Sequence, residues 1–137
     1  MPLIIWDETF SVGVKEIDGQ HQKMISIINR LFEMVANNNF NEAAVFNILN
    51  ELVDYADYHF TTEERYFREF DYPKTESHIE THNDYRERIR ELKEDYEDGK
   101  KNDVLADLAE FINGWWVWHI NHSDKEYTQC FHDHGLY

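Results

Sequence analysis

Six side chains that can bind a metal ion stand in three closely spaced pairs in this sequence, and His21 is a seventh candidate. His59 and Glu63 are four residues apart, and His78 and His82 have the same separation. This spacing places both members of a pair on one face of an α-helix, about 6 Å apart along its axis. Imidazole and carboxylate ligands suit iron, so the pattern predicts a transition-metal site. The seven candidate ligands are His21, His59, Glu63, His78, His82, His119 and Asp124.

The pair His119 and Asp124 departs from that spacing. These residues are five apart, which puts their side chains roughly 140° apart around a regular helix. Both can face one site only if the helix changes locally. We therefore predict a π-type turn or loosened geometry between Ile120 and Ser123, a feature often found at functional sites.

Four amphipathic segments position these side chains. Apolar residues recur with the helical period after an N-terminal stretch that lacks this period. Asp18, Asn41 and Thr75 are the expected N-caps of the first three helices. The sequence thus predicts one domain over residues 1–137, with an arm at 1–17 and helices at about 18–37, 41–70, 75–98 and 102–129.

Short connections between these helices predict an all-α, up-down-up-down four-helix bundle, in which successive helices are antiparallel neighbours. In that topology, the starts of the first and third helices lie at the same end as the ends of the second and fourth. The candidate ligands come early in the first and third helices and late in the other two. We therefore expect all seven to converge on one end of the core.

Each histidine alone has an ordinary structural interpretation. A buried histidine is usually a hydrogen-bonded core residue, and two ligand-type residues four apart are common on helices by chance. Burying seven ionisable groups without a cation, however, would cost several kcal/mol for each group. The combination favours metal binding. We expect Cys130 to be unreactive and the remaining histidines to be surface residues. These histidines are His122, His132 and His134.

Composition excludes several classes of partner. The 137 residues carry a formal net charge of −15, which repels nucleic acid and anionic membrane surfaces. The single cysteine cannot form an internal disulfide, and the start of the chain lacks the pattern of a signal peptide. Apolar runs are shorter than the roughly 20 residues that span a bilayer. We expect a soluble, cytoplasmic and monomeric protein.

Five segments of the chain resemble the bacterial hemerythrins (the bacteriohemerythrin family), and the resemblance covers essentially the whole chain. It implies two Fe ions per chain, one held by His78, His82 and His119 and the other by His21 and His59. Glu63 and Asp124 would bridge the ions beside an oxo or hydroxo group, and O₂ would bind reversibly at the second ion. The segments are Trp6–Val14, Ile17–His21, His59–Glu63, His78–His82 and His119–Asp124.

Ligand chemistry favours the same function. Five imidazoles and two carboxylates carry less negative charge than the four Glu and two His of ferritin-like oxidases, which stabilises a ferrous pair and disfavours cleavage of O₂. We therefore expect an oxygen carrier, storage or delivery protein rather than an enzyme, with O₂ as ligand and a protein that receives O₂ as a further candidate partner. Two alternatives stay open: a di-iron oxidase, peroxidase-like or nitric-oxide-handling enzyme, and an O₂ or redox sensor.

Overall fold

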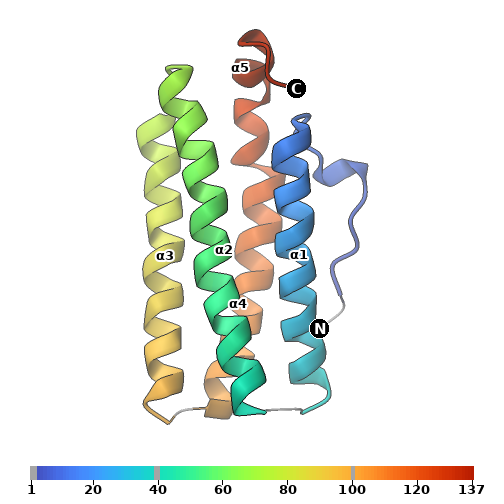
Figure 1. Cartoon of the computed structure of the whole chain (residues 1–137), viewed down its shortest axis with the longest axis vertical. Helices are drawn as coiled ribbons and strands as arrows, with labels where there is room; N and C mark the ends of the chain where they lie inside the picture. The colour runs from blue at the N-terminus through green and yellow to red at the C-terminus, as the bar shows by residue number, and fades with distance from the viewer. Residues whose placement is uncertain (1–2, 39–40, 100) are drawn as a thin grey trace.

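Four long α-helices make up most of the computed structural model, which describes residues 3–38, 41–99 and 101–137 (Figure 1). Two short 3₁₀-helices and one further helical turn lie near the ends of the chain. The long helices are α1 (Lys15–Ala36), α2 (Glu42–Glu69), α3 (Thr75–Glu97) and α4 (Lys101–Asn121). The short elements are η1 (Glu8–Phe10), η2 (Asp124–Tyr127) and α5 (Thr128–Asp133).

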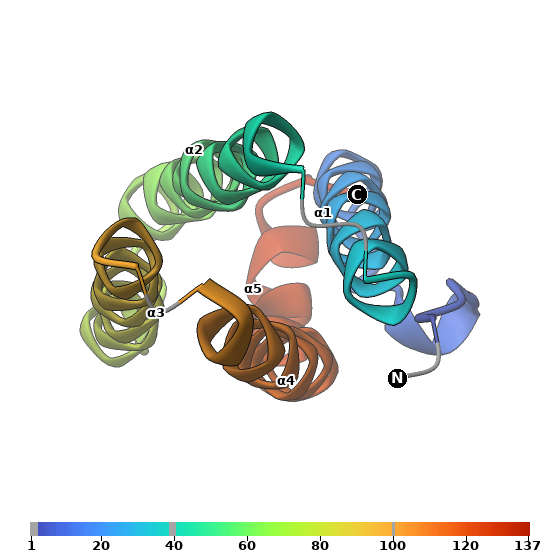
Figure 2. The same cartoon turned by 90° about the horizontal axis from the view of Figure 1, so that it is seen from below.

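The long helices surround a common core, as the view along the bundle shows (Figure 2). Helices adjacent in sequence are adjacent in space, and α4 also packs against α1. Their directions alternate, so the starts of α1 and α3 share one end with the ends of α2 and α4 (Figure 1). The predicted all-α, up-down-up-down bundle is confirmed. None of the described helices is long and apolar enough to cross a membrane.

Two apolar clusters hold the helices together. The larger runs along the bundle and includes Leu31, Leu52, Ile89 and Leu108, each at most 2% exposed. Burying one such side chain stabilises the fold by about 1.5–3 kcal/mol. The smaller cluster closes the end of the bundle where α5 lies, and it joins the N-terminal arm to the C-terminal elements. Its buried members are Val12, Val14, Ile17, Phe67, Tyr72, Tyr127 and Phe131.

The first helix begins earlier than expected, at Lys15 rather than Asp18, and the prediction that Asp18 is its N-cap is wrong. Val14, in an extended conformation, occupies the cap position. The Asp18 carboxylate instead accepts hydrogen bonds from Ser11 Oγ (2.5 Å) and from the Val12 backbone N–H (2.9 Å). It therefore fastens the arm to the first turn of α1.

The other predicted caps have mixed outcomes. Asn41 caps α2 as expected, and its side chain accepts from the backbone N–H groups of Ala43 and Ala44. Thr75 is not a cap: it is the first residue of α3, and its hydroxyl donates to the Tyr72 carbonyl at 2.6 Å. Asn39, expected in the turn after the first helix, lies outside the described residues, as do residues 1–2 of the expected arm.

The fourth helix does not continue to residue 129 as predicted. It ends at Asn121, and the His122 N–H makes an α-type bond to the Trp118 carbonyl at 2.9 Å. After a turn, the chain tightens into η2, where Glu126 N–H donates to the Ser123 carbonyl at 3.3 Å. The helix does change between His119 and Asp124, as their spacing requires, but the predicted π-type or loosened turn is wrong: the helix breaks and a tighter 3₁₀-helix follows.

Candidate metal centre

All seven predicted ligand residues lie together at one end of the bundle. They form two groups, and within each group the possible ligand atoms all lie within 4.8 Å of one another. Every one of the seven is at most 5% exposed. The first group is Glu63, His78, His82, His119 and Asp124. The second is His21, His59, Glu63 and Asp124. The two carboxylates thus belong to both groups.

Asp124 faces the two groups with different oxygen atoms. Its Oδ1 lies 3.0 Å from Nε2 of both His78 and His119, whereas Oδ2 lies 2.9 Å from Nε2 of His21. The break after α4 makes this possible, because it turns the chain so that the Asp124 side chain points into the core with no exposed surface. On an uninterrupted helix, His119 and Asp124 would have diverged.

Glu63 faces both groups with one oxygen. Its Oε1 lies 3.2 Å from Nε2 of His59 and 3.2 Å from Nε2 of His82. The other oxygen, Oε2, accepts a hydrogen bond of 2.6 Å from the Tyr127 hydroxyl. Helix α2 supplies His59 and Glu63 one turn apart, so both side chains leave the helix on the same face.

The polar atoms at the centre lack hydrogen-bond partners. Nε2 of all five imidazoles, Oε1 of Glu63 and both Asp124 oxygens are buried without a hydrogen bond of acceptable geometry. Their N···O distances of 2.9–3.2 Å are nevertheless short. Buried nitrogen and oxygen donors that converge in this way could hold a cation, and the donor set fits transition metals such as iron.

The carboxylates and imidazoles at the centre shift one another's pKa values. Burial raises the pKa of Asp124, but the imidazoles of His119, His21 and His78 more than offset it and hold that pKa well below its usual value. Burial and the neighbouring Asp124 likewise raise the pKa of Glu63, yet His59 and His82 lower it overall. Burial disfavours the imidazolium of His59, but Glu63 and Asp124 outweigh this effect and raise its pKa. Both carboxylates are therefore ionised at neutral pH.

Three residues that support the centre were missed by the sequence analysis: Gln20, Glu64 and Tyr127. Nδ1 of His59 lies 2.7 Å from Gln20 Oε1, and Nδ1 of His82 lies 2.8 Å from Glu64 Oε2. A histidine that binds metal through one nitrogen usually donates its other N–H to such an acceptor. Gln20 and Glu64 are each adjacent in sequence to a candidate ligand, and this was the available signal.

Aromatic rings cover the imidazoles. Phe60 stacks on His82 with ring centroids 4.0 Å apart, and Trp115 stacks on His119 at 4.2 Å. Trp116, which is fully buried, stacks on Phe60 and also contacts His59. These rings shield the imidazoles of His59, His82 and His119 from water and hold them in place.

The other three histidines lie outside both groups. His122 is exposed and stacks on Trp118, and His134 is exposed with Nδ1 near the Cys130 carbonyl at 2.8 Å. His132 is only partly exposed, because its Nε2 lies 2.8 Å from the Gly13 carbonyl at the arm. Burial raises the pKa of the Cys130 thiol, which agrees with an unreactive cysteine.

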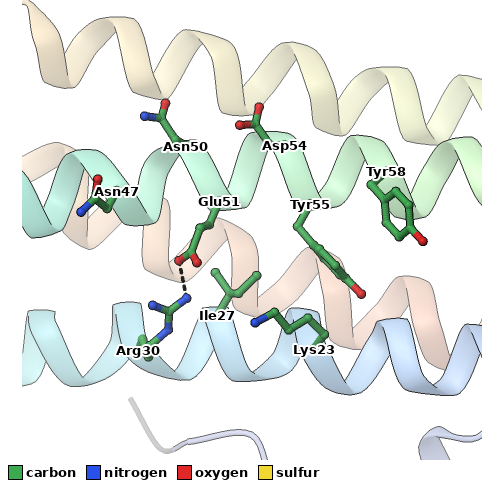
Figure 3. A pocket seen from close by; sticks show the side chains of 9 residues that line it. All are labelled: Lys23, Ile27, Arg30, Asn47, Asn50, Glu51, Asp54, Tyr55 and Tyr58. Atoms are coloured by element: carbon green, nitrogen blue, oxygen red, sulfur yellow. Dashed lines mark hydrogen bonds and ion pairs between the residues drawn. The ribbon is translucent and has the colours of Figure 1, made fainter.

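A surface cavity of about 630 Å³ lies between α1 and α2, away from the centre (Figure 3). An ion pair between Arg30 and Glu51 crosses it, and Lys23 and Tyr58 also line it. None of its lining residues belongs to either ligand group. We assign it no part in the centre.

Comparisons with known proteins agree with this geometry. Residues 12–130 match the family model of the hemerythrin HHE cation binding domain. A Bacteriohemerythrin of Stenotrophomonas maltophilia is 30% identical over 93% of this chain and 81% of its own length. A Hemerythrin-like protein of Naegleria gruberi is 33% identical over 89% of this chain and 88% of its own length. A crystal structure of wild-type hemerythrin superposes with a TM-score of 0.83 at 26% identity, covering 94% of this chain and 98% of that one.

Proposed function

The chain belongs to the hemerythrin family, and on that premise we propose that its buried cluster holds two iron ions and binds O₂ reversibly. The observation that carries this proposal is the division of the cluster into two groups that share Glu63 and Asp124. Two neighbouring cations bridged by two carboxylates would use every donor in the set.

The groups differ in the number of donor residues. The first offers five and the second offers four. Two ions of equal coordination number would therefore leave one more position free at the ion held by His21 and His59. O₂ would bind at the ion that His21 and His59 would hold. When bound, the iron pair supplies the site for O₂ and the electrons that it accepts.

The protein's own contribution is to hold the donors ready. His59 and His82 each direct an unpartnered Nε2 towards the centre, while Nδ1 is engaged by Gln20 or Glu64. The Tyr127 hydroxyl occupies Oε2 of Glu63, so that Oε1 alone faces the imidazoles. Prior orientation lowers the entropic cost of binding an ion.

Exclusion of water supports reversible binding rather than oxidation chemistry. The rings of Phe60, Trp115 and Trp116 pack against the imidazoles of His59, His82 and His119, and a dry site slows loss of reactive oxygen species to solvent. The donor set contains five neutral ligands and two anionic ones, which stabilises ferrous iron. Both features favour an oxygen carrier, storage or delivery protein over an enzyme.

Titration with ferrous iron under argon, followed by exposure to air, tests this function. Iron analysis of the desalted protein should give two ions per chain, and visible absorption should appear on exposure to O₂. A matched sample of Glu63→Ala should bind less iron, because both ions lose a shared ligand. The proposal would be contradicted if the unsubstituted chain held one iron ion or none, or if its visible absorption did not change on exposure to O₂.

A further inference from the structure

The two ligand groups rest on supporting side chains of different charge. In the first group, His82 Nδ1 lies 2.8 Å from the carboxylate of Glu64. In the second, His59 Nδ1 lies 2.7 Å from the amide oxygen of Gln20. Glutamate and glutamine have nearly the same size and shape. Charge is therefore the main difference between the two supports.

The direction of both hydrogen bonds is fixed by their surroundings. A carboxylate can only accept, so His82 donates its Nδ1–H to Glu64. The amide of Gln20 is oriented by its Nε2, which donates to Thr62 Oγ1 at 3.4 Å, while the Thr62 hydroxyl donates to the Tyr58 carbonyl at 3.0 Å. Gln20 thus presents its oxygen to His59. Both imidazoles leave a lone pair on Nε2 for a metal ion.

Arg86 holds the Glu64 carboxylate in place and offers it an opposite charge. Its Nη1 lies 3.1 Å from Glu64 Oε2, and its Nε donates to Asp57 at 3.0 Å. The guanidinium also sits over the ring of Phe60, with 5.1 Å between Cζ and the ring centroid. The side chain of Arg86 is 28% exposed, so solvent screens part of its charge.

We propose that Glu64 and Gln20 are positioning residues that make the two metal sites unequal. The site that includes His82 binds its ion more tightly, and the oxidised state of that ion is the more stabilised of the two. An anionic acceptor at Nδ1 pulls the shared proton towards itself, which makes Nε2 a stronger donor to a cation. A neutral amide does this less. The inference rests on the two-ion centre of the proposed function.

Reciprocal substitutions test the inference because the two supports can exchange identities. Glu64→Gln should weaken binding of the tighter ion by about 10- to 100-fold and raise the midpoint potential of the iron pair. Gln20→Glu should tighten the weaker ion and lower the midpoint potential. The probes are Co²⁺, titrated against a competing chelator, and redox titration of the iron-loaded protein. Glu69→Gln removes an exposed charge from the same helix and should change neither quantity appreciably.

The decisive result is that the two substitutions change metal affinity and midpoint potential in opposite directions. If Glu64 and Gln20 merely packed the core, both substitutions would weaken metal binding and neither would shift the potential in a charge-dependent way. Equal affinities and potentials in Glu64→Gln and the unsubstituted chain would overturn the inference, even with two irons and O₂ binding intact. If the unsubstituted chain bound no pair of ions, the proposed function itself would fail. Should Glu64→Gln not fold, Gln20→Glu alone still decides, because an unchanged or raised potential contradicts the inference.

Discussion

The hydroxyl of Tyr127 donates a 2.6 Å hydrogen bond to Oε2 of Glu63 inside a region where neither side chain is exposed. Burial and the charges of Glu63 and Asp124 raise the pKa of Tyr127 well above its usual value. The phenol therefore stays protonated and remains a donor at neutral pH. This bond joins η2, which follows the break after α4, to a shared ligand on α2.

Removing that hydroxyl should destabilise the protein without leaving a large cavity in the core. Tyr127→Phe keeps the ring but leaves Oε2 of Glu63 without its donor. Hydrogen bonds to charged groups contribute about 1.5–3 kcal/mol, so the free energy of unfolding of the metal-free protein should fall by about that amount in a urea titration. Tyr137→Phe, at a site 70% exposed, is the control and should unfold like the parent chain. Indistinguishable midpoints for the two variants would contradict the role given to Tyr127.

Two histidines three residues apart should respond differently to substitution. His119→Ala removes a buried donor that lies 3.0 Å from Asp124, so the protein should lose iron. His122→Ala removes an exposed ring that stacks on Trp118, and iron content should stay at the parent level. Iron analysis after desalting checks both. Loss of iron from His122→Ala would show that the end of α4 is arranged differently from the structure.

Metal removal should loosen one end of the bundle and spare the other. Asp124 in η2 is tied through the centre to His21 on α1 and His78 on α3, so an ion there braces elements that are distant in sequence. Amide hydrogen exchange should speed up in η2 and α5 after chelation. Amides near Leu31 and Leu108, in the larger apolar cluster, should keep their protection. Uniform acceleration along the chain would point to global destabilisation instead.

The metal-free and iron-loaded proteins should respond oppositely to mild acid. The raised pKa of His59 stabilises the folded chain below the unfolded value of about 6.5, and this contribution disappears as pH rises through the folded pKa. The lowered pKa values of Glu63 and Asp124 give stability above about pH 4 that is lost on further acidification. The metal-free chain should therefore be most stable between roughly pH 4.5 and 6.5.

Bound iron reverses the dependence of stability on pH near neutral pH, because protons compete with the metal for imidazole nitrogen. Between about pH 8 and 6, the iron-loaded protein should lose stability while the metal-free protein gains it. Urea titrations at several pH values, with and without chelator, measure both curves. Parallel curves would show that the buried histidines do not change protonation with metal binding.

The arrangement of the helices was predictable because it depends on periodicity. Apolar stripes and short connections determine the bundle, and the positions of His21 and His59 within their helices determine which end they share. Helix ends were less predictable, since they depend on contacts distant in sequence. Asp18 resembles a cap in sequence, but the structure uses it to hold Ser11 and Val12.

The geometry around Asp124 was only partly predictable. A spacing of five residues shows that the helix must change, but not whether it widens or breaks. The structure breaks it, and the chain continues in η2 with Tyr127 packed against Phe67 and Phe131. Supporting residues such as Gln20 have no periodic pattern of their own. Their roles depend on which imidazole nitrogen faces the centre, and this requires coordinates.

Repeated oxygenation of the reduced, iron-loaded protein tests the central claim most directly. The protein is exposed to O₂ and then flushed with argon for several cycles, while visible absorption, O₂ uptake and hydrogen peroxide in solution are followed. We predict uptake of one O₂ per iron pair, its release under argon, and a spectrum that returns to that of the reduced protein in each cycle. Stoichiometric peroxide release with permanent oxidation of the iron on the first cycle would contradict reversible binding and identify an oxidase.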